Sequence, residues 1–159
     1  MSTGIEGRHA DPNVFVQMDT YAVKGLQTGQ IQFLYAPTHL NPTYEYGVTF
    51  ERGTAVTYGD RKQIFISGTA SIDNQGEIMY PGDILKQTER MLENIDTLLQ
   101  EAGGGLQDIM QAIVYLRDPA DYVVVKQYIE HAPVCRPGWL IETECIAVIP
   151  ADAPQYAYL

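Results

Sequence analysis

The stretch richest in candidate chemical groups lies near the carboxyl end of the chain, where residues 135–147 read CRPGWLIETECIA. Arg136 and Glu142 stand there among mostly apolar neighbours, and a buried carboxylate needs a positive or hydrogen-bonding partner. If residues 140–148 form a strand, Glu142 and Glu144 share one face, because strand side chains alternate. We therefore expect one core face and one face that carries a site or an interface.

Further side chains are weaker candidates. Cys135 is either a modifiable pocket thiol or an incidental one, and we interpret it and Cys145 as reduced thiols. Trp139 could stack on a ligand, although a lone tryptophan at a strand entry more often packs against the core. We interpret Arg52 and Arg61 as solvated loop charges rather than carboxylate binders.

Length and charge limit the class of protein. The 159 residues suit one domain, and the formal net charge of -10 opposes binding to a nucleic-acid backbone. No apolar run approaches the about 20 residues of a membrane span. The histidines at His9, His39 and His131 lack ligand spacing, so we expect neither a metal site nor another cofactor. We expect a soluble, cytoplasmic protein.

The first half of the chain divides into two parts. Residues 1–43 have few periodic signals and are expected to form an N-terminal arm or an edge element ahead of one domain at 44–159. Within that domain, residues 44–50 and 63–68 are rich in β-forming residues on either side of a polar turn. We expect these two runs to pair as strands.

The second half alternates helices and strands. Residues 84–99 repeat apolar side chains at helical spacing and should end at the glycines from Gly103 onward. Residues 109–117 predict a strand, and residues 120–131 a second helix, although the β-branched run 123–125 would also suit a strand. The order predicts an α+β sheet with helices packed on one face.

Four segments keep a common order along the chain: IFISG at 64–68, QTERMLENI at 87–95, VYLRD at 114–118 and IETECIA at 141–147. In this order they resemble the Rid proteins, also called YjgF-type and formerly described as endoribonuclease L-PSP or translation initiation inhibitors. The words CRPGWLIE look closer to the chorismatase-like branch of that family than to its archetypal imine deaminases.

The resemblance implies a chorismate-mutase-like α+β subunit with a mixed sheet and two helices on one face. Three such subunits would close their sheets into a barrel, with sites in the clefts between neighbours. This homotrimer agrees with the expected sheet, because a sheet covered on one face only needs a partner for its other apolar face.

The resemblance also implies a chemistry. Deaminases of this family use an arginine to hold the substrate carboxylate and a glutamate to orient the water that attacks an imine or enamine carbon. The matching glutamate is Glu142, and Arg136 is the candidate arginine, since its planar fork suits a carboxylate. Ser67, Gly68 and the strand around Tyr115 would border the same pocket.

Three departures from the family pattern keep alternatives open. Arg136 precedes Glu142 by six residues instead of about fifteen, and the connection from His131 to Cys135 is short. The archetypal deaminases carry a tyrosine thirteen residues before the strand serine, and this position is Thr54 here. Its substitutes would be Tyr46, Phe50 or Tyr58.

The first hypothesis is therefore metal-free hydrolytic deamination of 2-imino or enamine acids. The second is a chorismatase-like hydrolysis with Glu142 as general acid. The third is binding of small carboxylate ligands without turnover, or a role as one domain of a larger polypeptide. Apart from these hypotheses, the structural alternative for Glu142 or Arg136 is an ion pair.

Overall fold

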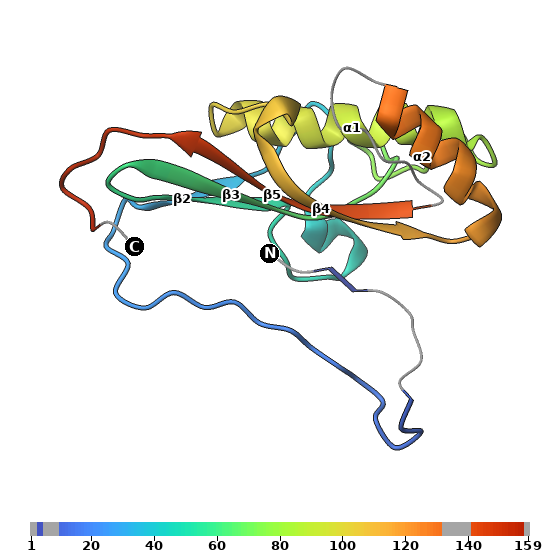
Figure 1. Ribbon diagram of the computed structural model, residues 1–159, viewed down its shortest axis with the longest axis horizontal. Helices are drawn as coiled ribbons and strands as arrows, with labels where there is room; N and C mark the ends of the chain where they lie inside the picture. Colours follow the sequence, from blue (N-terminus) through green and yellow to red (C-terminus); the bar gives the residue numbers. More distant parts are fainter. Residues whose placement is uncertain (1–2, 5–9, 132–140, 158–159) are drawn as a thin grey trace.

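A computed structural model describes residues 3–4, 10–131 and 141–157. It has an α+β fold in which two helices cover one face of a five-stranded sheet (Figure 1). The strands are β1 (Ile31–Leu34), β2 (Gly53–Thr57), β3 (Arg61–Thr69), β4 (Ile109–Leu116) and β5 (Ile141–Pro150). The helices are α1 (Ile84–Glu101) and α2 (Tyr122–His131), with short 3-10 turns at Thr43–Tyr46, Leu106–Asp108 and Pro119–Asp121.

The sheet is antiparallel, so the prediction of a mixed sheet was wrong. Its order is β1-β2-β3-β5-β4, and each neighbouring pair among these described strands runs antiparallel. The crossover through α1 does make β3 and β4 run in the same direction. They are not neighbours, however, because β5 lies between them and pairs antiparallel with both.

The predicted strand at residues 44–50 was also wrong. Residues Thr43–Tyr46 form a single 3-10 turn that ends at Gly47, whose φ of 78° is a left-handed conformation that glycine favours. Strand β3 pairs instead with β2. A short turn connects these two strands and sets Thr57 opposite Lys62. The edge strand β1 lies within the segment expected to be an arm.

The predicted helices and the strand between them are confirmed. Helix α1 begins after Asp83, whose carboxylate accepts a hydrogen bond from the Lys86 N–H at 3.1 Å, and the chain turns at Gly103 with a φ of 90°. The β-branched run at residues 123–125 is helical in α2. Val125 is buried there, because packing of a helix outweighs a weak local propensity.

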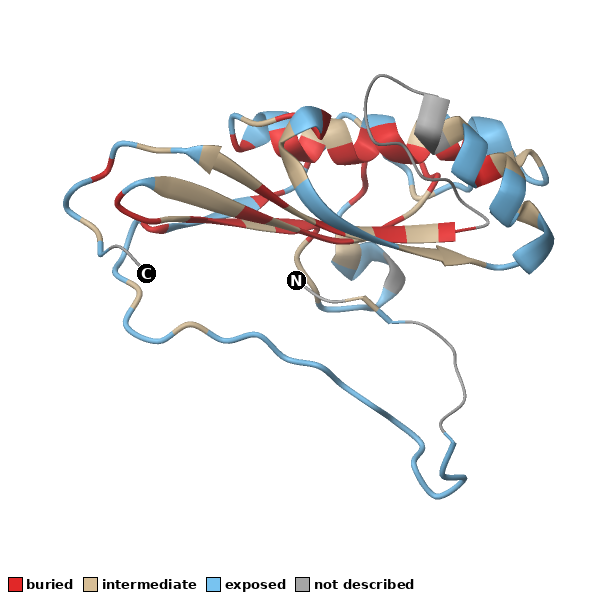
Figure 2. Cartoon of the chain, viewed as in Figure 1, coloured by how far each residue is buried: buried red, intermediate tan, exposed pale blue. Residues whose placement is uncertain are grey.

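The core lies between α1 and the helix-facing side of the sheet (Figure 2). Alternation along β5 buries Ile141, Thr143, Cys145 and Ala147 on this side, as predicted. The helix contributes Met91, Leu92, Ile95, Leu98 and Leu99, and β3 contributes Ile64 and Ile66. Within the described residues, no helix is long and apolar enough to cross a membrane.

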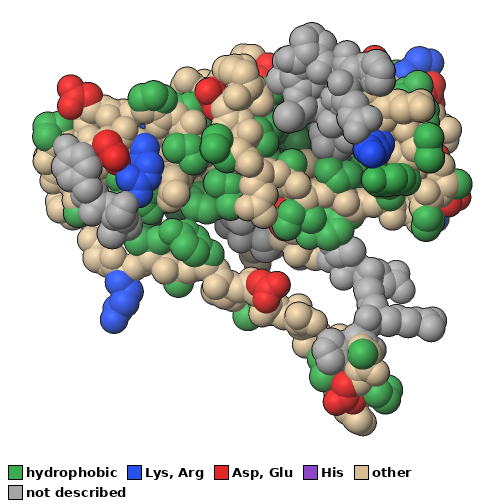
Figure 3. Space-filling view, viewed as in Figure 1, with side chains coloured by type: hydrophobic (Ala, Val, Ile, Leu, Met, Phe, Trp, Pro, Cys, Tyr) green, Lys and Arg blue, Asp and Glu red, His purple; other side chains and the backbone are tan. Residues whose placement is uncertain are grey.

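The opposite side of the sheet, here called the open face, is uncovered by helices in the described part of the chain (Figure 1). Strand register places Phe65 and Ile146 on it, flanked by Phe33 and Ile113, which are 48% and 41% exposed. The arm passes on this side, and its Tyr21 ring lies 5.7 Å from the Phe65 ring. Figure 3 shows many apolar side chains at the surface of the sheet layer and few Lys or Arg among them.

Candidate functional site

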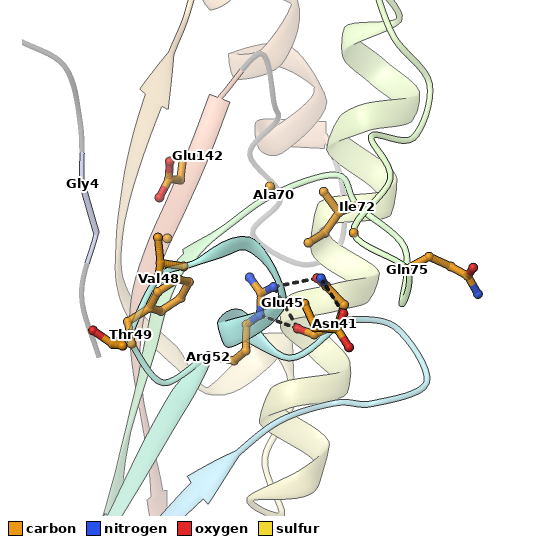
Figure 4. A pocket seen from close by; sticks show the side chains of 13 residues that line it. Gly4, Asn41, Glu45, Val48, Thr49, Arg52, Ala70, Ile72, Gln75 and Glu142 are labelled. Atoms are coloured by element: carbon orange, nitrogen blue, oxygen red, sulfur yellow. Dashed lines mark hydrogen bonds between the residues drawn. The ribbon is translucent and has the colours of Figure 1, made fainter.

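A cavity of about 600 Å³ lies where β5 and the end of β3 meet the loops at residues 41–52 and 70–76 (Figure 4). Glu142 and Gly68 line it from the sheet, and Asn41, Phe50 and Arg52 line it from the first loop. The cavity therefore combines a carboxyl group, a guanidinium group and an aromatic ring. It brings together two of the predicted site residues, Glu142 and Gly68.

Glu142 is the acid of this cavity. Its register opposite Tyr115 and the alternation of β5 turn its side chain away from the core, where it is half-buried. Burial, and then the charge of Glu144, raise the pKa of Glu142 above its usual range. Within the described residues, its carboxylate makes no hydrogen bond or ion pair. A carboxyl group of this kind can accept or donate a proton closer to neutral pH.

Gly68 leaves the space that the Glu142 side chain occupies. The pairing of β3 with β5 shifts register between Ile66 and Thr69, so the ladder is interrupted at Gly68. The Gly68 N–H donates instead to Thr3 Oγ1 at 2.9 Å. A Cβ atom at position 68 would collide with the Glu142 carboxyl group. Glycine is therefore required here by the close approach of Glu142.

Ser67 and Tyr115 border the site without lining the cavity. Ser67 is fully buried, and its hydroxyl donates to the carbonyl oxygen of Glu51. The Tyr115 hydroxyl donates to Glu144 Oε1 at 3.2 Å, and burial together with the Glu144 carboxylate raises the pKa of Tyr115. Both residues contact the strands and loops that hold Glu142 in place.

The predictions for Arg136, Cys135 and Trp139 fall outside the described residues. The other cysteine, Cys145, lies in the core, where burial, and then the Glu144 carboxylate, raise the pKa of its thiol to about 12. This thiol is therefore an inert core side chain. Over the described ranges, no group of three His, Cys, Asp or Glu side chains could hold a metal ion.

Arg52 was misjudged from the sequence. Instead of a solvated loop charge, it is a buried residue with 4% of its surface exposed, and its guanidinium carbon lies 5.4 Å from the centre of the Phe50 ring. Phe50 is one of the residues expected to replace the missing family tyrosine, and among the described side chains it is the one of these that lines the cavity. Tyr58 is buried beneath Arg61, which keeps partial exposure and an ion pair with Asp60 at 2.7 Å.

Replacing Glu142 with glutamine is expected to raise the melting temperature at neutral pH. A folded-state pKa above the unfolded value of about 4.3 means that ionising Glu142 costs folding stability. This cost is full above the raised pKa and disappears as the pH falls below about 4.3. The gain in melting temperature should therefore vanish in acid, as thermal unfolding across pH would measure. Exposed Glu77→Gln is the control and should follow the wild-type curve.

Comparisons with known proteins show the family of this chain. The family model described as Endoribonuclease L-PSP matches residues 53–149. The 3-aminoacrylate deaminase RutC of Acinetobacter baylyi is 37% identical over 76 residues, which are 47% of this chain and 60% of that protein. The chain thus spans about 60% of the length of the curated relatives it matches.

Solved structures share the fold. A chorismatase superposes with a TM-score of 0.61 at 23% identity, covering 75% of this chain and 44% of the other. Escherichia coli TdcF with bound serine superposes with a TM-score of 0.54 at 22% identity, covering 74% and 98%. At these identities the likeness shows the fold alone, and it gives no preference for the chorismatase-like branch.

Proposed function

Because the chain belongs to the endoribonuclease L-PSP family, the Rid/YjgF proteins, we propose that it hydrolyses small 2-imino or enamine acids to 2-oxo acids and ammonia. The observation that carries this proposal is the half-buried Glu142, with its raised pKa, at the wall of a cavity sized for a small molecule. The deaminase among the relatives supports the same reaction class.

In the proposed reaction, Glu142 accepts a proton from a water molecule as the water oxygen bonds to the imine carbon. The same carboxyl group then returns the proton to the nitrogen. This gives a carbinolamine. The Glu142 carboxylate then transfers the hydroxyl proton of the carbinolamine to the nitrogen as the carbon–nitrogen bond breaks, so that ammonia leaves and the carbonyl of a 2-oxo acid forms. An enamine enters after its β-carbon gains a proton and its nitrogen loses one, which gives the imine. One group can act first as base and then as acid if its pKa lies near the working pH.

We further propose that the active species is a homotrimer in which neighbouring copies cover the open face. Phe65 and Ile146 on that face, with the more exposed Phe33 and Ile113, are apolar side chains suited to a subunit interface. The cavity would then lie beside a second subunit, as the resemblance implies. The oligomeric state in solution is measurable by light scattering on the purified chain.

The experiment that tests the proposed function is a paired assay on the wild-type protein. We expect accelerated ammonia release from 2-imino acids generated in situ by an amino-acid oxidase, relative to the oxidase reaction with heat-denatured protein. Chorismate hydrolysis is measured beside it. Hydrolysis of chorismate alone would replace the proposal with an acid-catalysed enol-ether reaction. A folded protein that is silent in both assays would contradict any enzymatic role on these substrates.

A further inference from the structure

Residues Thr3 and Gly4 lie against the Glu142 side of the cavity, although they are far from Glu142 along the chain. Gly4 lines the cavity together with Glu142 and Gly68. Figure 4 shows the Glu142 side chain pointing from β5 toward the side on which Gly4 lies. Thr3 and Gly4 therefore belong to the part of the wall that is nearest to the proposed acid–base group.

Thr3 is held there by the backbone of Gly68. The register shift between Ile66 and Thr69 interrupts the ladder of β3 and β5, and a partly buried backbone donor needs an acceptor. The Thr3 hydroxyl supplies this acceptor, since the Gly68 N–H donates to Thr3 Oγ1 at 2.9 Å. A hydroxyl group from a distant part of the chain thus occupies a donor beside Glu142.

The Thr3 side chain also crowds the Glu142 carboxyl group. A Cβ atom at position 68 would lie 2.8 Å from Thr3 Cγ2, and the same atom would collide with Glu142 Oε1. The methyl group of Thr3 and the carboxyl group of Glu142 therefore flank one point of the wall. A water molecule or an imine carbon that approaches Glu142 from the Gly68 side needs the space that Thr3 takes.

This contact is weak enough to be reversible. Thr3 is half-buried and Gly4 is exposed, and in the described part of the chain the bond to Gly68 is the one hydrogen bond that either residue makes. Water can replace the hydroxyl at a partly exposed N–H, so the net strength of such a neutral hydrogen bond is modest. Thr3 can therefore leave Gly68 without loss of the fold.

We propose that Thr3 and Gly4 form an autoinhibitory strap, which must leave Gly68 before a substrate binds beside Glu142. The inference rests on the proposed function, because it concerns the regulation of the site at which imine hydrolysis is proposed. The strap and the substrate then compete within one molecule. Such competition raises the apparent KM by the inverse of the strap-free fraction and leaves kcat unchanged.

Thr3→Val tests the strap in the full chain. Valine keeps the branched shape of threonine but offers no oxygen to the Gly68 N–H, so the strap-free fraction should rise. We expect the KM for oxidase-generated 2-imino acids to fall about two- to tenfold, the usual range for one neutral hydrogen bond, at unchanged kcat. Partial unfolding would not tighten substrate binding. An unchanged or higher KM would overturn the proposal.

Two control variants accompany Thr3→Val. Thr3→Ser keeps the hydroxyl oxygen and should retain the wild-type KM. Thr20→Val makes the same substitution at an exposed arm residue that does not line the cavity, and its KM should also be that of the wild type. A fall in KM as large as that of Thr3→Val in either control would count against the bond to Gly68 as the cause, and the strap would be refuted.

Hydrogen exchange of the Gly68 amide, followed by NMR, gives a readout that needs no turnover. We expect exchange to be about two- to tenfold faster in Thr3→Val than in the wild type and in Thr3→Ser, because the bond protects the amide. Equal exchange rates would refute the strap.

Failure of this inference differs from failure of the proposed function. Imine turnover with the same KM in wild type and Thr3→Val would retain the deaminase and refute the strap. Protection of the Gly68 amide by Thr3, in a protein that is silent on imines even as Thr3→Val, would retain the contact and refute the deaminase.

Discussion

Glu142→Gln is expected to lower the rate of ammonia release by about 10²–10⁴-fold, the usual contribution of a general acid–base group. Glutamine keeps the shape of the side chain but cannot accept a proton from water. The effect should appear in kcat rather than in KM, because Glu142 is proposed to act on the reacting atoms. Initial rates on oxidase-generated imines, at matched protein concentration, measure it.

Glu144→Gln is the matched control for this variant. Glu144 lies on the same face of β5 and bonds the Tyr115 hydroxyl, but it does not line the cavity. We expect turnover to persist, with the acid limb of the pH profile moved to lower pH, because the Glu144 charge helps raise the pKa of Glu142. Comparable turnover in Glu142→Gln and wild type would remove Glu142 from the mechanism.

Gly68→Ala is expected to reduce turnover by about 10²-fold, a typical result of displacing a reacting group by about 1 Å. The new Cβ would occupy the position of the Glu142 carboxyl group, which must then move. Because Gly68 has no left-handed φ, alanine adds little backbone strain, and the loss should come from the site rather than from unfolding. Steady-state kinetics and a thermal melt separate these two causes.

The double variant Gly68→Ala with Glu142→Gln tests whether Gly68 acts through Glu142. If it does, adding Gly68→Ala to Glu142→Gln should cost little further activity, since residues that act as a unit are not additive. Additive losses would indicate a separate role for Gly68, such as contact of its N–H with the ligand. The control measurement is a thermal melt of both single variants, in which Gly68→Ala should stay close to the wild-type melting temperature and Glu142→Gln should show the increase predicted above.

Local patterns were sufficient for several parts of the fold. The 3.6-residue spacing of apolar side chains predicted α1, because one stripe of a helix must face the core. Alternation along β5 predicted that Glu142 and Glu144 leave the core face, because successive strand side chains point in opposite directions. Four short motifs predicted the family, which the family model then confirmed.

Strand pairing decided what local patterns could not. The first paired strand was expected at residues 44–50, which left Arg52 in a loop. In the structure, the hairpin of β2 and β3 pairs Gly53 with Ile66, and the Ser67 N–H donates to the Arg52 carbonyl oxygen at 3.0 Å. A hairpin register counted from a two-residue turn at residues 59–60 would have predicted this proximity.

By itself, the sequence determined the helices α1 and α2, the strands β3, β4 and β5 and the two faces of β5, because each depends on residues a few positions apart. The tertiary structure decided the antiparallel order of the sheet and the meeting of Arg52, Asn41 and Glu142 around one cavity. These contacts join segments up to about 100 residues apart. The entropic cost of closing such long loops and the free energy gained by burial depend on strand register, which no local spacing encodes.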